Sequence, residues 1–341
     1  MRPTPADPTV ATEEWFLHHG LSYFVPEERH AARAALRARR IVPLLLVVVV
    51  LATGTGGLLA WVAHQVTVAP ALLISVGLGA ATWYALTVLR ARPIVTWALA
   101  RTFGSLRTLL PMTTRALPLL LMFITFLFIN TEVWQVATHL SVGALWLVAL
   151  LFLLLGVAFL LVRLPEEVDR TDDDVDDRML LDATRGTPLE ESCRELVQDP
   201  ARHPAAYAEV TGYERWNLVV VLMIVQSVQV LLLTLSVFAF LMVFGSLTMT
   251  EWVMQAWLMH GAHHLPGMPG ASTELLQVSV FLASFSGLYL TVSTVTDETY
   301  REQFFGDVMR ELERAVGVRA VYLALRDAEQ RAGGDEARTA R

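Results

Sequence analysis

Apolar residues in this chain are gathered into runs of about 20, separated by polar segments. A helix needs about 20 apolar residues to cross the hydrocarbon core of a bilayer, at a rise of about 1.5 Å per residue. Six runs meet this requirement, at residues 41–62, 70–89, 117–137, 143–162, 218–244 and 275–296. The pattern predicts an all-α polytopic membrane protein with six transmembrane helices.

The composition agrees with a membrane protein and excludes several other classes. Of the 341 residues, 54% are hydrophobic and only 17% are charged, whereas soluble domains carry about 25% charged residues. The single cysteine excludes a disulfide scaffold, and the net charge of −7 argues against a nucleic-acid partner. The lipid bilayer is therefore the first expected partner.

The arginines predict the orientation of the spans. All 26 basic residues are arginine, and none lies in the segments that follow the first, third and fifth spans. Because basic residues mark the cytoplasmic side, we expect both termini inside and residues 245–274 as an outer loop. The absence of lysine is typical of GC-rich bacterial genomes, so we expect a bacterial cytoplasmic (inner) membrane.

Three segments are predicted to lie in the cytoplasm. Residues 1–40 form an amphipathic segment, with a helix from Pro26 and aromatic residues ahead of it that suit the headgroup region. Residues 164–217 form an acidic, partly helical loop with 15 acids against six arginines after Arg163. Helix starts are expected in it at Thr187 and His203, whereas the acid run 172–177 lacks the glycine and glutamate of an EF-hand and is interpreted as a solvated spacer.

The third cytoplasmic segment, residues 297–341, continues the last span as a helix and ends in a disordered tail from residue 332. One face of this helix is apolar, formed by Phe305, Met309, Leu312 and Val316. Such a face needs a covering partner: the protein's own loops, the bilayer surface, a second copy of the chain or a cytoplasmic protein. Small residues in the first two spans, such as Ser75 and Gly79, fit close packing or a homo-oligomer.

Glu132 is the one acid that lies well inside a predicted span. Burial of a charge in the bilayer costs about 2 to 4 kcal/mol, so such a residue usually pairs, becomes protonated or faces water. Gln135 and His139 follow at helical spacing and share its face. These three residues are a candidate ion or proton site.

Two further spans carry polar stripes that could line a path next to this site. The candidates are Gln226, Gln229, Ser286, Tyr289 and Ser293. Amides and hydroxyls also join membrane helices without any water, so packing is the alternative interpretation of both stripes.

The predicted outer loop carries three histidines, His260, His263 and His264. Histidine is a common ligand of zinc and copper, and Glu251 or Glu274 could complete a three-ligand site. The spacing is not HExxH, however, and a flexible pH-sensitive loop is the alternative. The cofactor requirement is not defined by the sequence.

The leading hypothesis for function is a conduit or transporter for protons, cations or a small solute that uses Glu132. The alternative is a membrane scaffold or regulatory subunit that docks a partner through its cytoplasmic segments. A metal-dependent membrane enzyme comes third, because the sequence contains no phosphate-binding loop, nucleophile elbow or CxxC pair. An enzymatic role is therefore uncertain and less expected than a non-enzymatic one.

Overall fold

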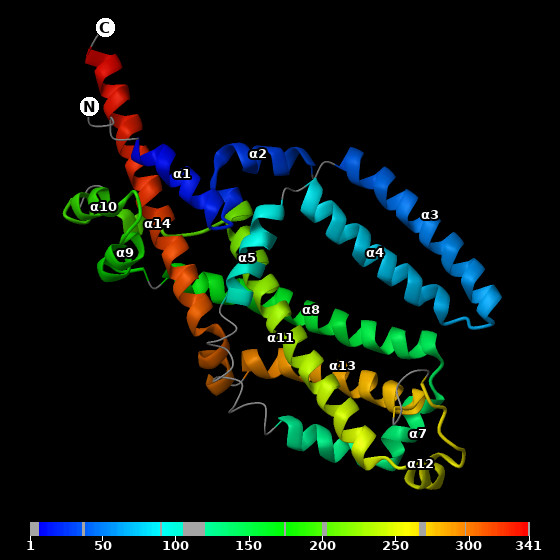
Figure 1. Ribbon diagram of the computed structural model, residues 1–341. Coiled ribbons are helices and arrows are strands. Elements are labelled where there is room, and N and C mark those ends of the chain that lie inside the picture. Colours follow the sequence, from blue (N-terminus) through cyan, green and yellow to red (C-terminus); the bar gives the residue numbers. More distant parts are fainter. Residues whose placement is uncertain are drawn as a thin grey trace, which may run out of the picture.

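The computed structural model describes residues 7–35, 38–88, 91–104, 120–173, 175–199, 203–265, 271–296 and 298–339. This part of the chain is helical and contains no strands, which confirms the predicted all-α class. The elements are α1 (Pro8–His18), η1 (Ser22–Phe24), α2 (Pro26–Ala35), α3 (Ala38–Ala63), α4 (Val68–Thr87), α5 (Arg92–Gly104), α7 (Thr131–His139), α8 (Val142–Asp173), α9 (Asp177–Thr184), α10 (Glu190–Val197), η2 (Pro204–Tyr207), α11 (Gly212–Thr248), α12 (Glu251–Leu258), α13 (Thr273–Thr296) and α14 (Glu298–Thr339) (Figure 1).

Five of the described helices, α3, α4, α8, α11 and α13, are long and apolar enough to cross a membrane. The remaining predicted span, residues 117–137, differs from the expectation of one straight helix. Its described part consists of a helical segment, Leu120–Phe128, followed by α7 at a bend of 74°. The described residues therefore contain five candidate spans, or six if this bent pair counts as one.

The bend has a local cause in the sequence around Asn130. The side chain of Asn130 caps α7, because its Oδ1 accepts a hydrogen bond of 2.8 Å from the backbone N–H of Glu132. Asn is a favoured N-cap residue and starts a new helix in place of continuing the old one. The buried indole of Trp134 donates to the carbonyl of Phe128 at 2.7 Å, so the interrupted backbone remains paired.

Helices α8, α11 and α13 pack together as the centre of the apolar region, and α4 joins α3 to α8. The approach between α11 and α13 is close, since a Cβ on Gly287 would lie 2.7 Å from Oγ1 of Thr234. Between α8 and α13 the approach is less close, since a Cβ on Gly156 would lie 3.5 Å from Oγ1 of Thr291, in ordinary van der Waals contact. Gly287 thus permits the tight packing between α11 and α13 that membrane helices use.

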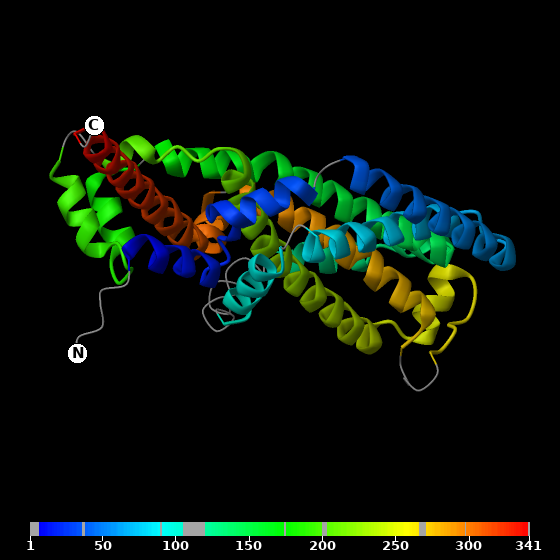
Figure 2. The same cartoon turned by 90° about the horizontal axis from the view of Figure 1, so that it is seen from above.

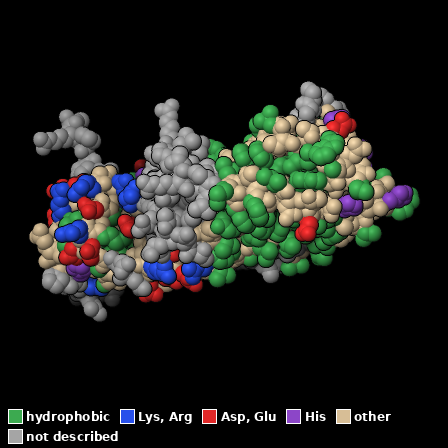
Figure 3. Space-filling view, turned by 90° about the horizontal axis from the view of Figure 1, so that it is seen from below, with side chains coloured by type: hydrophobic (Ala, Val, Ile, Leu, Met, Phe, Trp, Pro, Cys, Tyr) green, Lys and Arg blue, Asp and Glu red, His purple; other side chains and the backbone are tan. Residues whose placement is uncertain are grey.

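Charged side chains gather at one end of the molecule, which we call the arginine end (Figure 3). It contains α1, α9, α10 and α14, while the apolar helices extend away from it (Figures 1 and 2). The opposite end, which we call the histidine end, carries α7, α12 and the loop between α12 and α13. This separation of charge from apolar surface is the arrangement expected of a protein with one end outside the bilayer.

Three of the four aromatic residues of the N-terminal segment are buried inside the protein, and the fourth, Trp15, is half-buried. Phe16 and Phe24 are fully buried, and Phe16 packs edge-on against Tyr322 of α14. Nearby, the buried side chain of Asn217 accepts from the N–H of Tyr23 and donates to the carbonyl of Gly20. The expected placement of this patch in the headgroup region is therefore corrected: it forms part of the core.

The apolar face of α14 is also covered by the protein's own helices. Leu312 and Val316 are buried in the same core as α9 and the N-terminal segment, whereas the side chains of Phe305 and Met309 lie outside the described residues. Self-packing thus covers the described part of the surface that suggested a docking partner. Helix α14 continues to Thr339, over most of the stretch expected to be disordered.

Candidate metal centre

The loop between α12 and α13 is held next to the start of α13 by backbone pairing. Helix α12 is followed by its C-cap residue Met259, which adopts a left-handed conformation with φ of 63° and turns the chain. The following residues form an antiparallel β-bridge between His264 and Ser272. The N–H of Thr273 donates to the carbonyl of His263 at 2.8 Å, so this histidine is fixed beside the first turn of α13.

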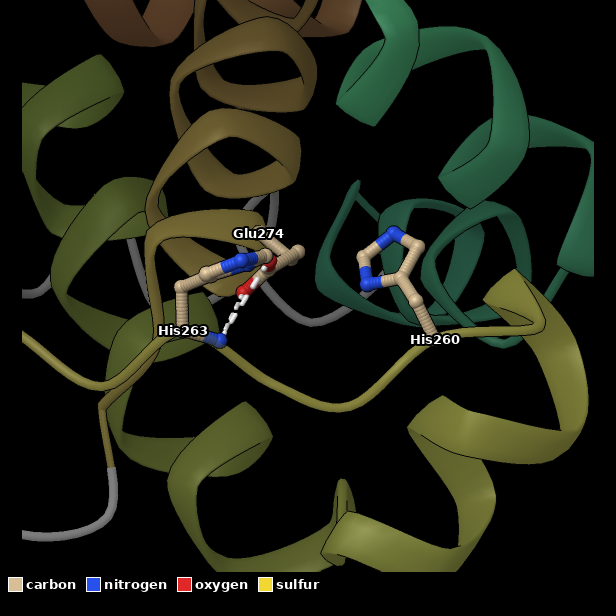
Figure 4. Close-up of side chains that lie close together, drawn as sticks. All are labelled: His260, His263 and Glu274. Carbon is tan, nitrogen blue, oxygen red and sulfur yellow. Dashed lines mark hydrogen bonds and ion pairs between the residues drawn. The ribbon is translucent and has the colours of Figure 1, made fainter.

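Glu274 and His263 form a direct pair in this turn (Figure 4). Nδ1 of His263 lies 2.6 Å from Oε1 of Glu274, and the backbone N–H of His263 donates to Oε2 at 3.2 Å. Only 4% of Glu274 is exposed, whereas 76% of the His263 side chain is. The buried carboxylate is therefore held in place beneath an imidazole that is exposed on the surface of the protein.

His260 approaches the pair from the end of α12 (Figure 4). Its ring centroid lies 5.7 Å from that of His263. His260, His263 and Glu274 each offer one ligand atom, and these atoms all lie within 4.8 Å of one another. This is the one such cluster among the described residues.

Two imidazoles and one carboxylate are the protein ligands of many catalytic zinc sites, in which the fourth position holds water or substrate. The exposed histidines leave such a position accessible here. Metal binding to this set would displace the proton shared between His263 and Glu274, so affinity would rise with pH. The backbone N–H of His263, which donates to the second carboxylate oxygen, would orient the ligand.

The structure brings together only part of the predicted metal set. His260 and His263 join Glu274, while His264 is left out. Neighbouring side chains of an extended strand point in opposite directions, which explains why His263 faces Glu274 and His264 does not. Glu251, the other candidate acid, begins α12 and is not part of the cluster.

The predicted ion site lies on α7, after the bend. Glu132 occupies the first turn of α7, where a negative charge is favoured by the helix dipole. Glu132, Gln135 and His139 are all exposed. Gln135 donates to the carbonyl of Trp257 in α12 at 3.2 Å, so this helix packs against the element that leads into the metal loop.

The two polar stripes lie on α11 and α13, and their residues differ in burial. Gln226 and Gln229 are buried, as is Ser286, whose hydroxyl donates to the carbonyl of Leu282 in its own helix. Tyr289 and Ser293 lie on the same helix as Ser286 but are less buried. Tyr289 is 39% exposed and stacks on Phe123, and Ser293 is half-buried.

Among the described side chains of α11 and α13, two polar atoms are buried without a hydrogen-bond partner. They are Oε1 of Gln229 and Oγ of Ser279. Buried polar groups are nearly always paired, with protein or with water. Each of these atoms therefore lacks the hydrogen bond that buried polar groups usually make.

No known protein family, curated protein or solved structure matches this chain. Its function is therefore inferred from the chemistry of the described side chains.

Proposed function

We propose that this chain is a membrane protein that binds a transition-metal ion of the zinc class at its histidine end, through His260, His263 and Glu274. The observation that carries the proposal is the buried carboxylate of Glu274, 2.6 Å from one imidazole and in a cluster with a second. A buried charge must be paired or must coordinate a metal. The exposed imidazoles supply ligands that can accept the ion from solution.

A purely structural role for the pair is the competing explanation. In that case His263 and Glu274 would close the loop against α13, and His260 would contribute nothing. Metal binding requires all three groups, because a two-ligand site loses much of its affinity and geometry. Among the hydrogen bonds between described residues, none joins His260 to Glu274. Replacement of His260 therefore separates the two explanations, because it should weaken metal binding and leave the pair of His263 and Glu274 intact.

The test is a zinc titration of the purified full-length protein in detergent, after treatment with a chelator, followed by calorimetry. The wild type should bind one Zn²⁺, and His260→Ala, His263→Ala and Glu274→Gln should each lower the affinity by at least about tenfold. His264→Ala is the matched control and should bind as the wild type does. Equal binding by wild type and His260→Ala, or no binding by wild type, would refute the proposal.

Cation transport is a second candidate function, favoured by the bend at Asn130 and by the partnerless polar atoms of α11 and α13. Interrupted helices and polar atoms inside the membrane are features of transport proteins. In this role Glu132, Gln135 and His139 would hold the ion or proton near the metal loop. Gln226, Gln229, Ser286, Tyr289 and Ser293 would line its path.

Transport is tested by proton and zinc flux into liposomes that contain the purified protein. Wild-type flux that is abolished by Glu132→Gln, with folding and insertion intact, would support the role of this carboxylate. Unchanged flux in Glu132→Gln would show that Glu132 has no role in transport. Metal binding without any wild-type flux would leave the first proposal intact and exclude the second.

A further inference from the structure

A cavity of about 700 Å³ lies at the arginine end, between the end of α8, α9 and α14. Its walls contain five arginines and three acids. The arginines are Arg170, Arg178, Arg185, Arg310 and Arg314. Such a concentration of arginine is unusual here, because the segment from 164 to 217 is the most acidic part of the chain.

Helix packing explains why these side chains converge. Helix α9 begins after Asp176, whose carboxylate caps it by accepting from the N–H of Met179 at 2.7 Å. It then packs closely on α14, since a Cβ on Gly317 would lie 2.5 Å from Cβ of Ala183. Arg310 and Arg314, one turn apart on α14, consequently face the same cavity as Arg178 in α9.

The acids in and beside the cavity neutralise only part of the positive charge of its arginines. Arg170 pairs with Glu167 and Arg185 pairs with Asp182, each at 3.1 Å. Asp176 and Glu313 are the other two acids of the walls. Five arginines against three acids leave the walls with a net positive charge.

Arg314 is held in place and still has an unused donor. Its guanidinium lies over the ring of Trp15 at 5.6 Å, and Nη2 donates to the carbonyl of Arg185 at 3.2 Å. Its Nε is buried and has no hydrogen-bond partner. A buried donor of this kind is costly unless an acceptor reaches it.

We propose that this cavity binds a phosphate-bearing anion. The planar fork of a guanidinium matches the oxygens of a phosphate, and several such forks around one pocket are the usual means of holding it. The phosphate could belong to an anionic lipid headgroup, because Arg170 and Thr171, which line the cavity, lie at the end of a candidate membrane span. It could equally belong to a soluble phosphate compound, which presents the same oxygens.

Two experiments on metal-free, full-length protein distinguish these sources. In the first, protein in phosphatidylcholine nanodiscs is titrated with inorganic pyrophosphate by calorimetry. In the second, protein is incorporated into mixed phosphatidylglycerol and phosphatidylcholine vesicles, and the lipids that co-purify are measured by mass spectrometry. Both are repeated with Arg178→Gln, Arg310→Gln and Arg314→Gln.

Each of these variants should lower pyrophosphate affinity by about tenfold, or reduce the retained phosphatidylglycerol, because one charge-assisted hydrogen bond is lost. Arg194→Gln removes the same charge from α10, outside the cavity, and should change neither result. Pyrophosphate binding indicates a soluble ligand, and selective retention of phosphatidylglycerol indicates a lipid. The proposal is overturned if neither probe binds, or if Arg178→Gln and Arg310→Gln bind as well as the wild type.

Discussion

The carboxylate of Glu214, at the start of α11, lies 2.6 Å from Nη2 and 2.7 Å from Nε of Arg319 in α14. Both residues are buried. Arg29 of α2 contacts the other carboxylate oxygen at 2.6 Å, and Arg319 also donates to the carbonyls of Tyr207 and Glu209. One carboxylate therefore joins the N-terminal segment, the loop before α11 and the C-terminal helix.

Glu214→Gln should destabilise this assembly by about 3 kcal/mol, because removal of one partner leaves Arg319 buried without its counter-charge. The free energy of unfolding of the purified protein, from chemical or thermal denaturation, measures the effect. The rate of hydrogen exchange in α14 measures it locally. Glu166→Gln is the control, since Glu166 pairs with Arg163 at an exposed site and should matter by less than about 1 kcal/mol. Equal stability of the two variants would contradict the role of Glu214.

Tyr322 makes the stability of the arginine end depend on pH in the alkaline range. Burial, together with the hydrogen bond from its hydroxyl to Glu13, raises the pKa of Tyr322 to about 12. The folded state therefore favours the neutral phenol, and this stabilisation is complete below the unfolded pKa of about 10. It is lost as the pH rises from about 10 to about 12.

Tyr322→Phe should therefore unfold with a shallower dependence on pH between about 10 and 12 than the wild type does. Unfolding followed by circular dichroism across this range is the measurement. Tyr84→Phe, in α4 and away from the arginine end, keeps the number of titrating phenols equal and is the control. Parallel pH curves for wild type and Tyr322→Phe would show that Tyr322 makes no such contribution.

Cys193 should be unreactive in the native protein. It is fully buried in α10, and burial raises the pKa of its thiol, so little thiolate is present at about pH 7.5. Mass spectrometry should find no N-ethylmaleimide adduct before denaturation and a full adduct after it. A cysteine placed at exposed Glu191 in a Cys193→Ala background should react at once, and rapid native labelling of Cys193 itself would contradict the packing of α10.

The orientation of the chain remains a prediction from its arginines and can be tested with the same chemistry. In a Cys193→Ala background, Ala262→Cys should react with a membrane-impermeant maleimide in intact cells. Arg194→Cys should react only after the cells are opened. The reverse result would place the histidine end inside and the arginine end outside.

The sequence predicts the helices well because span length and apolar composition are local properties. It does not predict the bend in the third span, although Asn130-Thr131-Glu132 carries an N-cap signal, because the surrounding apolar run fits one continuous helix. The helices α1, α5 and α9 also escape prediction, since they are short and depend on packing.

The candidate sites are less predictable, because they depend on contacts between distant residues. The choice of Glu274 over Glu251, and of His263 over His264, results from the bridge between His264 and Ser272, which the sequence does not reveal. Glu214 and Arg319 are 105 residues apart. No periodicity links such a pair, so the sequence alone does not identify it.

The visible spectrum of bound cobalt shows whether His260, His263 and Glu274 hold a metal ion together. Metal-free protein is mixed with one equivalent of Co²⁺, a spectroscopic probe of zinc sites, and its visible absorption is recorded. The wild type and His264→Ala should show the intense bands of four-coordinate cobalt, and His260→Ala and Glu274→Gln should lose them. A wild-type spectrum identical to that of Co²⁺ in buffer, or bands that persist in both ligand variants, would contradict the assignment of His260, His263 and Glu274 as a metal centre.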